Sequence, residues 1–325
     1  MKQKKYSYIS IILILLSILA LILSSKQALE GARHGLFICA NVIAPSLFPF
    51  FVLTLLLSAL GFPQLISKKA EPLMQKLFGL SGACCAPLIL GLFGSYPIGA
   101  ATTAELYRRG IIEKREAQRL LPFCNNTGPA FIIGAAGVGI FGSSALGLLL
   151  YICHVAAALC VGFIFCSGQS VSQKTETSAF ATVQSLPQAL SGCVKSAAAG
   201  TITICGFVVF FSVFTGILDF FGFFSSVSGY LADTLGLELS FSRSLLTGVL
   251  ELGSGIGSMY GLGATPLNIA LASFILGFGG ASVHLQTLAV LEGTEIKCAL
   301  HFAGRITHGI IAAVLSYVPS MLILA

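Results

Sequence analysis

The stretch FCNNTGPAFIIG, residues 123–134, places two asparagines, a threonine, a glycine and a proline inside an apolar segment. A membrane helix needs about 20 predominantly apolar residues in succession, and polar side chains at membrane depth are costly unless they serve a site or a partner. Pro129 suits the first position of a helix, and Thr127 or Gly128 can cap that helix. The stretch therefore predicts a broken helix, with the first part ending near Cys124 and the second beginning at Pro129.

The composition supports a membrane setting for this break. The chain has 325 residues, of which 56% are hydrophobic and 9% are charged, and its mean hydropathy is +0.94. A soluble domain is typically about 25% charged, so these charges are too few to cover a water-facing surface. Apolar runs such as IILILLSILALIL do not alternate, which favours helices over barrel strands. We therefore expect an all-α polytopic membrane protein in a lipid bilayer.

The basic residues predict how the chain is oriented. An apolar run over residues 9–23 follows MKQKK and lacks a small-x-small cleavage site, so 1–32 is expected to be an uncleaved N-terminal transmembrane helix. Cytoplasmic loops carry an excess of Lys and Arg in membrane proteins. The loops that this rule places inside hold Lys68, Lys69, Lys76, Arg108, Arg109, Lys114, Arg115, Arg119, Lys174, Lys195 and Lys297.

The remaining chain divides into two halves of matching design. Repeat 1 covers 33–166 and repeat 2 covers 189–325, and a polar cytoplasmic linker over 167–188 joins them. Each repeat reads as a helix, a re-entrant hairpin, a broken helix and a final helix. The hairpins are expected at 83–104 and 245–263, and the broken helices at 120–141 and 267–291. Each half crosses the membrane three times, so the second is inverted relative to the first, as in many secondary transporters.

The four breaks and the buried charges supply the candidate substrate-binding residues. Helix N-termini at a break present free N–H groups to oxygen acceptors or anions, and an arginine can bind a carboxylate through two hydrogen bonds. The candidates are Ser95, Tyr96, Asn125, Asn126, Thr127, Gly128, Glu251, Ser254, Gly279, Ser282 and Arg305. Structural alternatives stay open: the asparagines can satisfy a proline kink, the glycines can be packing contacts, and Glu251 can form an ion pair with Arg305.

Other chemistry finds little support in the sequence. The ten cysteines are scattered without a disulfide or metal-binding pattern, and neither a phosphate-binding loop nor an H-E-x-x-H motif occurs. We therefore predict no catalytic residue, no metal and no cofactor, while leaving a coupling ion and homo-oligomerisation open. Nothing in the sequence indicates a nucleic-acid partner.

Several motifs resemble those of a known family. LFGSYPIGAATTAELYRRG, FCNNTGPAFIIGAAGVG, SFILGFGGASVHLQ and RITHG are similar to motifs of the YlbJ/SpoVV sporulation integral membrane proteins, which have a nucleoside recognition gate domain. That family is similar in turn to concentrative nucleoside transporters, in which two hairpins and two broken helices form the substrate site. The resemblance implies that GSYP and ELGSG are the hairpin tips, and that NNTG and GFGGAS are the breaks.

The resemblance also implies a function and a location. The family is implicated in moving dipicolinic acid into the developing spore, so a small anionic substrate is expected, in the cell membrane or the outer forespore membrane. A second hypothesis is an ion-coupled transporter of a nucleoside or another metabolite. A third is a membrane scaffold or membrane-embedded enzyme that transports nothing.

Overall fold

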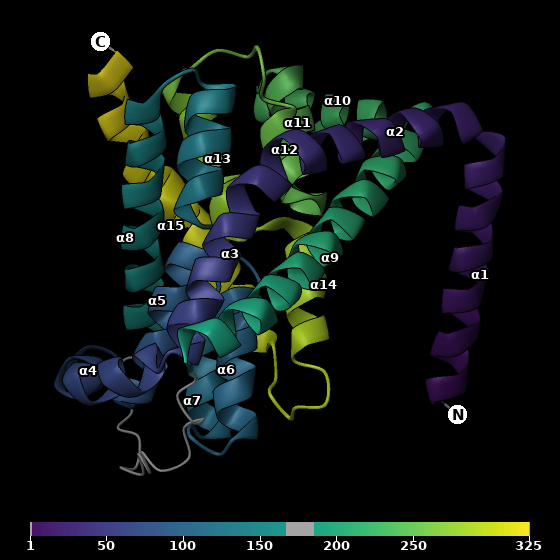
Figure 1. The fold of residues 1–325 in the computed structure, drawn as a ribbon. Helices are drawn as coiled ribbons and strands as arrows, with labels where there is room; N and C mark the ends of the chain where they lie inside the picture. The colour runs from purple at the N-terminus through teal and green to yellow at the C-terminus, as the bar shows by residue number, and fades with distance from the viewer. Residues whose placement is uncertain (1, 167–184, 325) are drawn as a thin grey trace.

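The computed structural model describes residues 2–166 and 185–324, and over them the chain consists of helices, turns and loops (Figure 1). The first part contains α1 (Lys2–Leu23), α2 (Ser25–Ile38), η1 (Cys39–Ile43), α3 (Ala44–Ala59), α4 (Phe62–Phe78), η2 (Gly82–Cys84), α5 (Cys85–Gly94), α6 (Ile98–Arg108), α7 (Lys114–Cys124), η3 (Ala130–Ile140) and α8 (Ser144–Cys166). The second contains α9 (Leu186–Phe220), α10 (Phe223–Leu235), α11 (Leu239–Leu250), α12 (Leu252–Gly257), α13 (Pro266–Phe278), α14 (Gly280–Val290) and α15 (Ala299–Leu324). Residues 167–184 of the predicted linker lie outside the described residues.

The helices include enough apolar length for several membrane crossings. By length and composition, four segments in the described residues can cross a membrane: Ser144–Cys166, Leu186–Phe220, Pro266–Val290 and Ala299–Leu324. The number rises to six if each of two bent helix pairs forms one span. The predicted crossing at 120–141 does not count as a long helix, because the NNTGP break divides it into α7 and η3. The all-α polytopic membrane class predicted from composition is confirmed.

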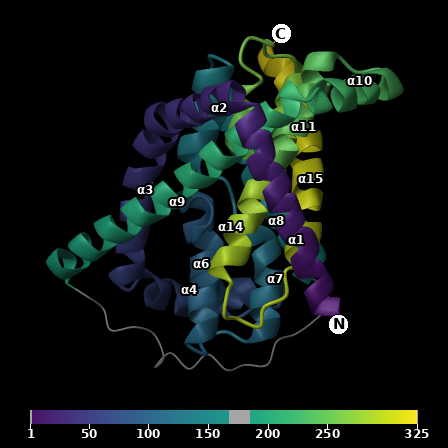
Figure 2. The same ribbon diagram turned by 90° about the vertical axis from the view of Figure 1, so that its right-hand side faces the viewer.

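The N-terminal helices are bent against each other. The two apolar parts, Tyr8–Leu23 and Ser25–Asn41, meet at an angle of 96°. Figure 1 shows α1 standing apart from the helices beyond α2, and in Figure 2 the same helix crosses in front of them. Its apolar side chains from Ile9 to Leu23 are largely exposed. A helix that exposes apolar side chains around its circumference suits contact with lipid.

The first predicted hairpin is occupied by α5 and α6, with the reversal at residues 95–97. Gly91 on α5 and Gly99 on α6 both pack on the backbone of Cys124, where an added Cβ would lie 1.8 and 1.9 Å from the Cys124 carbonyl oxygen. The two arms of the hairpin therefore close around the end of α7. Close approach of backbones at small residues is a common way to pack membrane helices.

The hairpins of the two halves lie at opposite ends of the molecule. In Figure 1, α6 and α7 reach the lower end with the basic turn between them, whereas α11 and α12 lie at the upper end. An inverted repeat would produce this opposition, and the duplication itself stays a prediction.

Three local features differ from the sequence analysis. First, α4 is one helix that continues through Pro72, in a stretch to which the repeat pattern assigned no element. Second, the sequence analysis did not predict α10, an amphipathic helix bounded by Gly222 and Gly236 in left-handed conformations. Third, the two helices of the second hairpin differ in length, because α11 covers Leu239–Leu250 whereas α12 covers only Leu252–Gly257.

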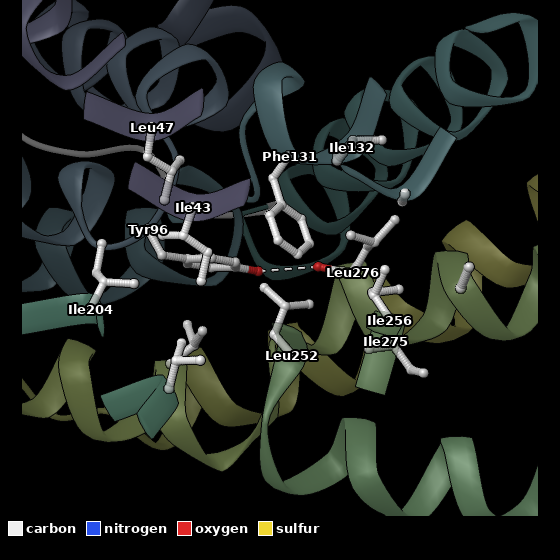
Figure 3. Packing of buried hydrophobic residues seen from close by; sticks show 14 of the residues in the cluster. Ile43, Leu47, Tyr96, Phe131, Ile132, Ile204, Leu252, Ile256, Ile275 and Leu276 are labelled. Carbon is white, nitrogen blue, oxygen red and sulfur yellow. Dashed lines mark hydrogen bonds between the residues drawn. The ribbon is translucent and has the colours of Figure 1, made fainter. Parts of the chain in front are cut away.

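A hydrophobic cluster joins the two halves at the centre of the molecule. Figure 3 shows 14 residues of this cluster and labels ten of them. They extend from Ile43 and Leu47 on one side to Leu252, Ile256 and Ile275 on the other. The Tyr96 hydroxyl crosses between the halves and donates to the Leu276 carbonyl over 3.3 Å. The breaks of both halves therefore meet inside a packed apolar shell.

Candidate functional site

A small cavity of about 40 Å³ lies where the hairpin tips and the helix breaks meet. Residues from both halves of the chain line it: Ile43, Leu47, Ser95, Tyr96, Thr127, Phe131, Ile204, Val208, Glu251, Leu252, Gly253, Ser282, Val283 and Gln286. We call this space the central cavity. Five of the predicted substrate-binding residues line it, namely Ser95, Tyr96, Thr127, Glu251 and Ser282.

Side chains of the first half satisfy the end of a helix in the second half. The break after α13 leaves backbone carbonyls without helical partners, as at any helix C-terminus. Thr127 Oγ1 donates to the Leu276 carbonyl over 3.0 Å, and the Tyr96 hydroxyl donates to the same oxygen. Tyr96 and Thr127 therefore have two roles, since they line the central cavity and also fix the opposing break.

The two asparagines face protein partners and do not line the central cavity. Asn125 Nδ2 donates to Thr287 Oγ1 over 2.9 Å, and its Oδ1 accepts from the Ala100 N–H over 3.4 Å. Asn126 Nδ2 donates to the Phe123 carbonyl over 2.7 Å, which caps the end of α7. Both residues are completely buried. In this conformation the two asparagines have the structural role that the sequence left open as an alternative. They satisfy polar groups of the backbone and neighbouring side chains where the helix breaks.

Arg305 is a buried junction between elements of both halves. Its Nη1 donates to Asn126 Oδ1 over 3.2 Å and to His308 Nδ1 over 2.9 Å. Its Nη2 donates to the Tyr96 hydroxyl and the Gly277 carbonyl. All four acceptors are neutral, and Arg305 does not line the central cavity. The guanidinium therefore faces the protein in this conformation, and the proposed clamp on a substrate carboxylate would require it to turn.

Glu251 begins α12 and has no ion pair with Arg305. Its two carboxylate oxygens accept from the N–H groups of Gly253 and Ser254 over 2.9 and 2.5 Å, which is an N-cap. The ion pairs found in the described residues lie elsewhere, at Arg109–Glu105, Lys114–Glu295 and Arg243–Asp219. The alternative of a structural Glu251–Arg305 pair is therefore wrong for this structure. Glu251 instead presents a buried carboxylate to the central cavity.

The other predicted site residues lie around this cavity. The Ser282 hydroxyl lines it, is buried, and makes no hydrogen bond of standard geometry with the described residues. Ser254 faces a separate cavity of about 470 Å³ and approaches Ser212 with 3.2 Å between the hydroxyl oxygens. Gly128 and Gly279 pack against the first hairpin tip, because an added Cβ would lie 3.0 Å from the Ser95 Cβ and 3.2 Å from the Tyr96 hydroxyl, respectively.

Two features of the site were not among the predicted site residues. Phe131 and Gln286 line the central cavity. Phe131 lies among apolar neighbours, which gave no signal for it, and Gln286 lies outside the quoted breaks and hairpin tips. The rings of His154 and His308 pack together with centroids 4.4 Å apart and planes tilted by 39°. Because Arg305 donates to His308 Nδ1, the Nε2 of His308 carries the proton and donates to the His154 carbonyl over 3.0 Å. These histidines occupy matching places in the two predicted repeats, which is the signal that could have found their contact.

The arrangement suits binding of a small molecule. The cavity offers hydroxyl groups, aromatic rings, apolar walls and one carboxylate, contributed by hairpins and broken helices of both halves. Irregular backbone at membrane depth is tolerated where protein buries it or where it lines a cavity. Sites built from broken helices of two halves of a chain are common in secondary transporters.

Comparison with solved structures identifies the fold. The transporter CNTnw in an outward-facing state has a TM-score of 0.53 and 15% sequence identity, covering 99% of this chain and 85% of that chain. The same transporter in an intermediate state has a TM-score of 0.51 and 16% identity, covering 98% and 86% of the two chains. These identities establish the fold alone. The fold is similar to that of a concentrative nucleoside transporter.

Comparison with sequence families defines the particular group. Residues 40–180 match the Gate family, whose description is nucleoside recognition. The sporulation integral membrane protein YlbJ of Bacillus subtilis (strain 168) is 30% identical over 97% of this chain and 83% of its own length. The chain belongs to the family of this sporulation integral membrane protein. The multi-pass membrane location and the family predicted from the motifs are confirmed.

Proposed function

We propose that this protein carries a small organic solute across a membrane of the sporulating cell, and that the solute is an aromatic carboxylate, with dipicolinic acid as the first substrate to test. The observation that carries this proposal is the meeting of all four breaks at the central cavity. Ser95, Tyr96 and Thr127 come from the first half, whereas Glu251 and Ser282 come from the second. A solute held there would contact both halves, so its binding would depend on how the halves are placed.

The size of the cavity indicates that the binding site must open. A volume of about 40 Å³ holds only a few waters, whereas small-molecule sites usually measure about 300–1,000 Å³. Movement of the hairpins or broken helices against each other would enlarge it. Such movement is the alternating access that transporters with two inverted repeats use.

The walls suit a flat aromatic solute. The rings of Tyr96 and Phe131 face the cavity together with aliphatic side chains. Hydroxyl groups of Thr127 and Ser282 can donate to carboxylate oxygens. Glu251 opposes an anion, because two negative charges in a buried site repel each other strongly. Binding of a dicarboxylate therefore requires a proton or a cation on Glu251. This proton or cation would be the coupling ion whose identity the sequence left open.

A second candidate follows from the same carboxylate. An ionised Glu251 accepts hydrogen bonds from hydroxyl groups, so it favours a neutral hydroxylated solute such as a nucleoside. The Gate match over residues 40–180 supports this candidate as well. Ion-coupled transport of a nucleoside or a similar metabolite is therefore the alternative to dipicolinate transport.

Uptake by reconstituted protein tests both candidates. The purified chain in liposomes is given labelled dipicolinate or labelled uridine, with proton, sodium or no gradients. Saturable dipicolinate uptake supports the first candidate, and uridine uptake without dipicolinate uptake supports the second. If the folded protein moves neither solute under any gradient and binds neither, the transport proposal fails and a scaffold or an enzyme becomes the better hypothesis.

The variant Glu251→Gln separates the two substrates within one experiment. Loss of the charge should maintain or strengthen dipicolinate binding, because the repulsion disappears. The same change should weaken nucleoside binding by about 1–3 kcal/mol if a hydroxyl group loses a charged acceptor. Glu292→Gln is the matched control, since Glu292 is exposed in the loop between α14 and α15.

A further inference from the structure

Three cavities follow one another along α3. The largest, of about 780 Å³, touches Pro45 at the start of this helix. The central cavity touches Leu47, two residues further, together with Ile43 just before the helix. The third, of about 460 Å³, touches Leu55, Ser58 and Ala59 near the end of the helix. We call the first the outer cavity and the third the inner cavity, because α4 and the basic α6–α7 turn lie at the end where α3 finishes (Figure 1).

The outer cavity is mainly apolar and adjoins the central cavity directly. Its walls come from η3, α12 and the segment from α2 to α3, and its polar lining side chains are His34, Asn41 and Tyr260. Only two residues, Phe131 and Gly253, line both cavities. Gly253 has no side chain that could close the space between them. Phe131 is therefore the one residue with a side chain that lines both cavities.

The wall that carries Phe131 is built from residues with little side-chain volume. It belongs to η3, a π-helix of sequence AFIIGAAGVGI, and Gly134 and Gly139 of this helix face the outer cavity. A Cβ added at Gly134 would meet no atom within 4 Å. The π-helical turn is less regularly packed than an α-helix and is frequent at functional sites. The Phe131 ring thus has open space on its outer side into which it can turn.

We propose that Phe131 is a movable partition between the two cavities, and that the outer cavity is the vestibule through which the transported solute reaches the central cavity. The proposal rests on the transport function proposed above. The occupant of the vestibule is the solute itself, because the vestibule and the central cavity share Phe131 and Gly253 as walls. The apolar vestibule favours a flat aromatic solute over a small hydrophilic one, since it offers little compensation for lost hydration.

Cysteine accessibility tests this partition without requiring transport. Val283 lines the central cavity, so Val283→Cys reports reagent that passes the partition. Gly134→Cys reports the vestibule, and Gly192→Cys reports the inner cavity, because a side chain at either glycine enters open space. Purified protein in oriented liposomes is treated from the outer face with a membrane-impermeant thiol reagent. Peptide mass spectrometry locates each modification, so the ten native cysteines need not be removed.

The partition predicts a defined pattern of rates. From the outer face, Gly134→Cys should react fast, while Gly192→Cys and Val283→Cys react slowly. Adding Phe131→Ala should accelerate the reaction at Val283→Cys roughly tenfold, which corresponds to about 1.4 kcal/mol in the opening equilibrium. Phe131→Met should retain the slow rate, because its side chain keeps most of the bulk. Phe141→Ala is the matched control, since Phe141 lies at the end of the same π-helix and lines neither cavity.

The outcomes distinguish this inference from the transport proposal. An unchanged rate at Val283→Cys in a folded Phe131→Ala protein would overturn the partition, as would equal acceleration by Phe141→Ala. Slow reaction at Gly134→Cys from the outer face would overturn the vestibule. If the pattern of rates is found but no solute is transported, the partition stands and the transport proposal fails. Size-exclusion chromatography of each variant excludes misfolding as the cause of fast labelling.

Discussion

Arg305 Nη1 donates a hydrogen bond of 3.2 Å to Asn126 Oδ1, although the two residues are 179 positions apart in the chain. This contact joins the last helix to the first break, and the other nitrogen of the guanidinium joins the first hairpin to the second break through Tyr96 and Gly277. A charge inside a membrane protein is tolerated when hydrogen bonds surround it. The geometry therefore assigns Arg305 a positioning role.

Arg305→Ala should destabilise the protein before it affects substrate binding. The change leaves the acceptors at Asn126, His308 and Gly277 without a donor, and each buried polar group left unpaired costs about 1–3 kcal/mol. A fluorescence melting curve in detergent should show a lower apparent melting temperature and loss of the monodisperse peak. Arg305→Lys should lose less, because one ammonium group can replace some of these bonds. A fully stable Arg305→Ala protein that no longer binds substrate would instead assign Arg305 to the substrate.

Thr127→Val should weaken both the contact between the breaks and the binding of the solute. Valine has a similar shape but cannot donate to the Leu276 carbonyl, which then depends on Tyr96 alone. Because that carbonyl retains one donor, the loss of stability should be about 1 kcal/mol, at the lower end of the range for a buried hydrogen bond. Thr127→Ser keeps the hydroxyl group and should behave as the wild type. Isothermal titration and melting curves of both variants check this, and equal behaviour of Thr127→Val and wild type would contradict it.

Gly91→Ala should disturb the first hairpin because no space exists for a methyl group. The added Cβ would lie 1.8 Å from the carbonyl oxygen of Cys124, so α5 and α7 must separate. Overpacking of this kind typically costs about 1–3 kcal/mol. Gly134→Ala is the control, since its Cβ would meet no atom within 4 Å. Melting temperatures of the two variants should differ clearly, and equal values would show that the hairpin tolerates a looser contact.

The sequence could predict where the helices break but not which way the side chains at the breaks point. Proline and glycine interrupt helices through their own backbone chemistry, so the ends of α7 and α13 follow from Pro129 and Gly279. The contacts of Asn125 with Thr287 and of Asn126 with Arg305 join distant parts of the chain, and only the packed structure selects such partners. The same reason explains why Phe131 was missed, since an apolar residue among apolar neighbours gives no sign that it borders a cavity.

The contact between Lys114 and Glu295 predicts a dependence on pH and salt at the basic end of the molecule. Their charged groups lie 2.9 Å apart, and nearby Arg108 donates to the carbonyls of Val290 and Glu292, so the α6–α7 turn is attached to the loop after α14. The hydrogen bond and the charge of Lys114 lower the pKa of Glu295, and Glu295 in turn raises the pKa of Lys114. A lowered carboxyl pKa stabilises the folded state above the unfolded pKa, and this contribution is lost as the pH falls through the folded pKa.

For Lys114 the sign is reversed, because its raised pKa stabilises the folded state below the unfolded pKa and loses this contribution as the pH rises through the folded pKa. The pair should therefore contribute most near neutral pH. We expect the melting temperature of Glu295→Gln to lie slightly below that of the wild type at pH 7 in low salt. The difference should vanish in acid, and also in about 1 M salt, where the screening length falls to about 3 Å. Glu292→Gln should show no such dependence, and a difference that persists in high salt would mean that Glu295 acts through packing instead of charge.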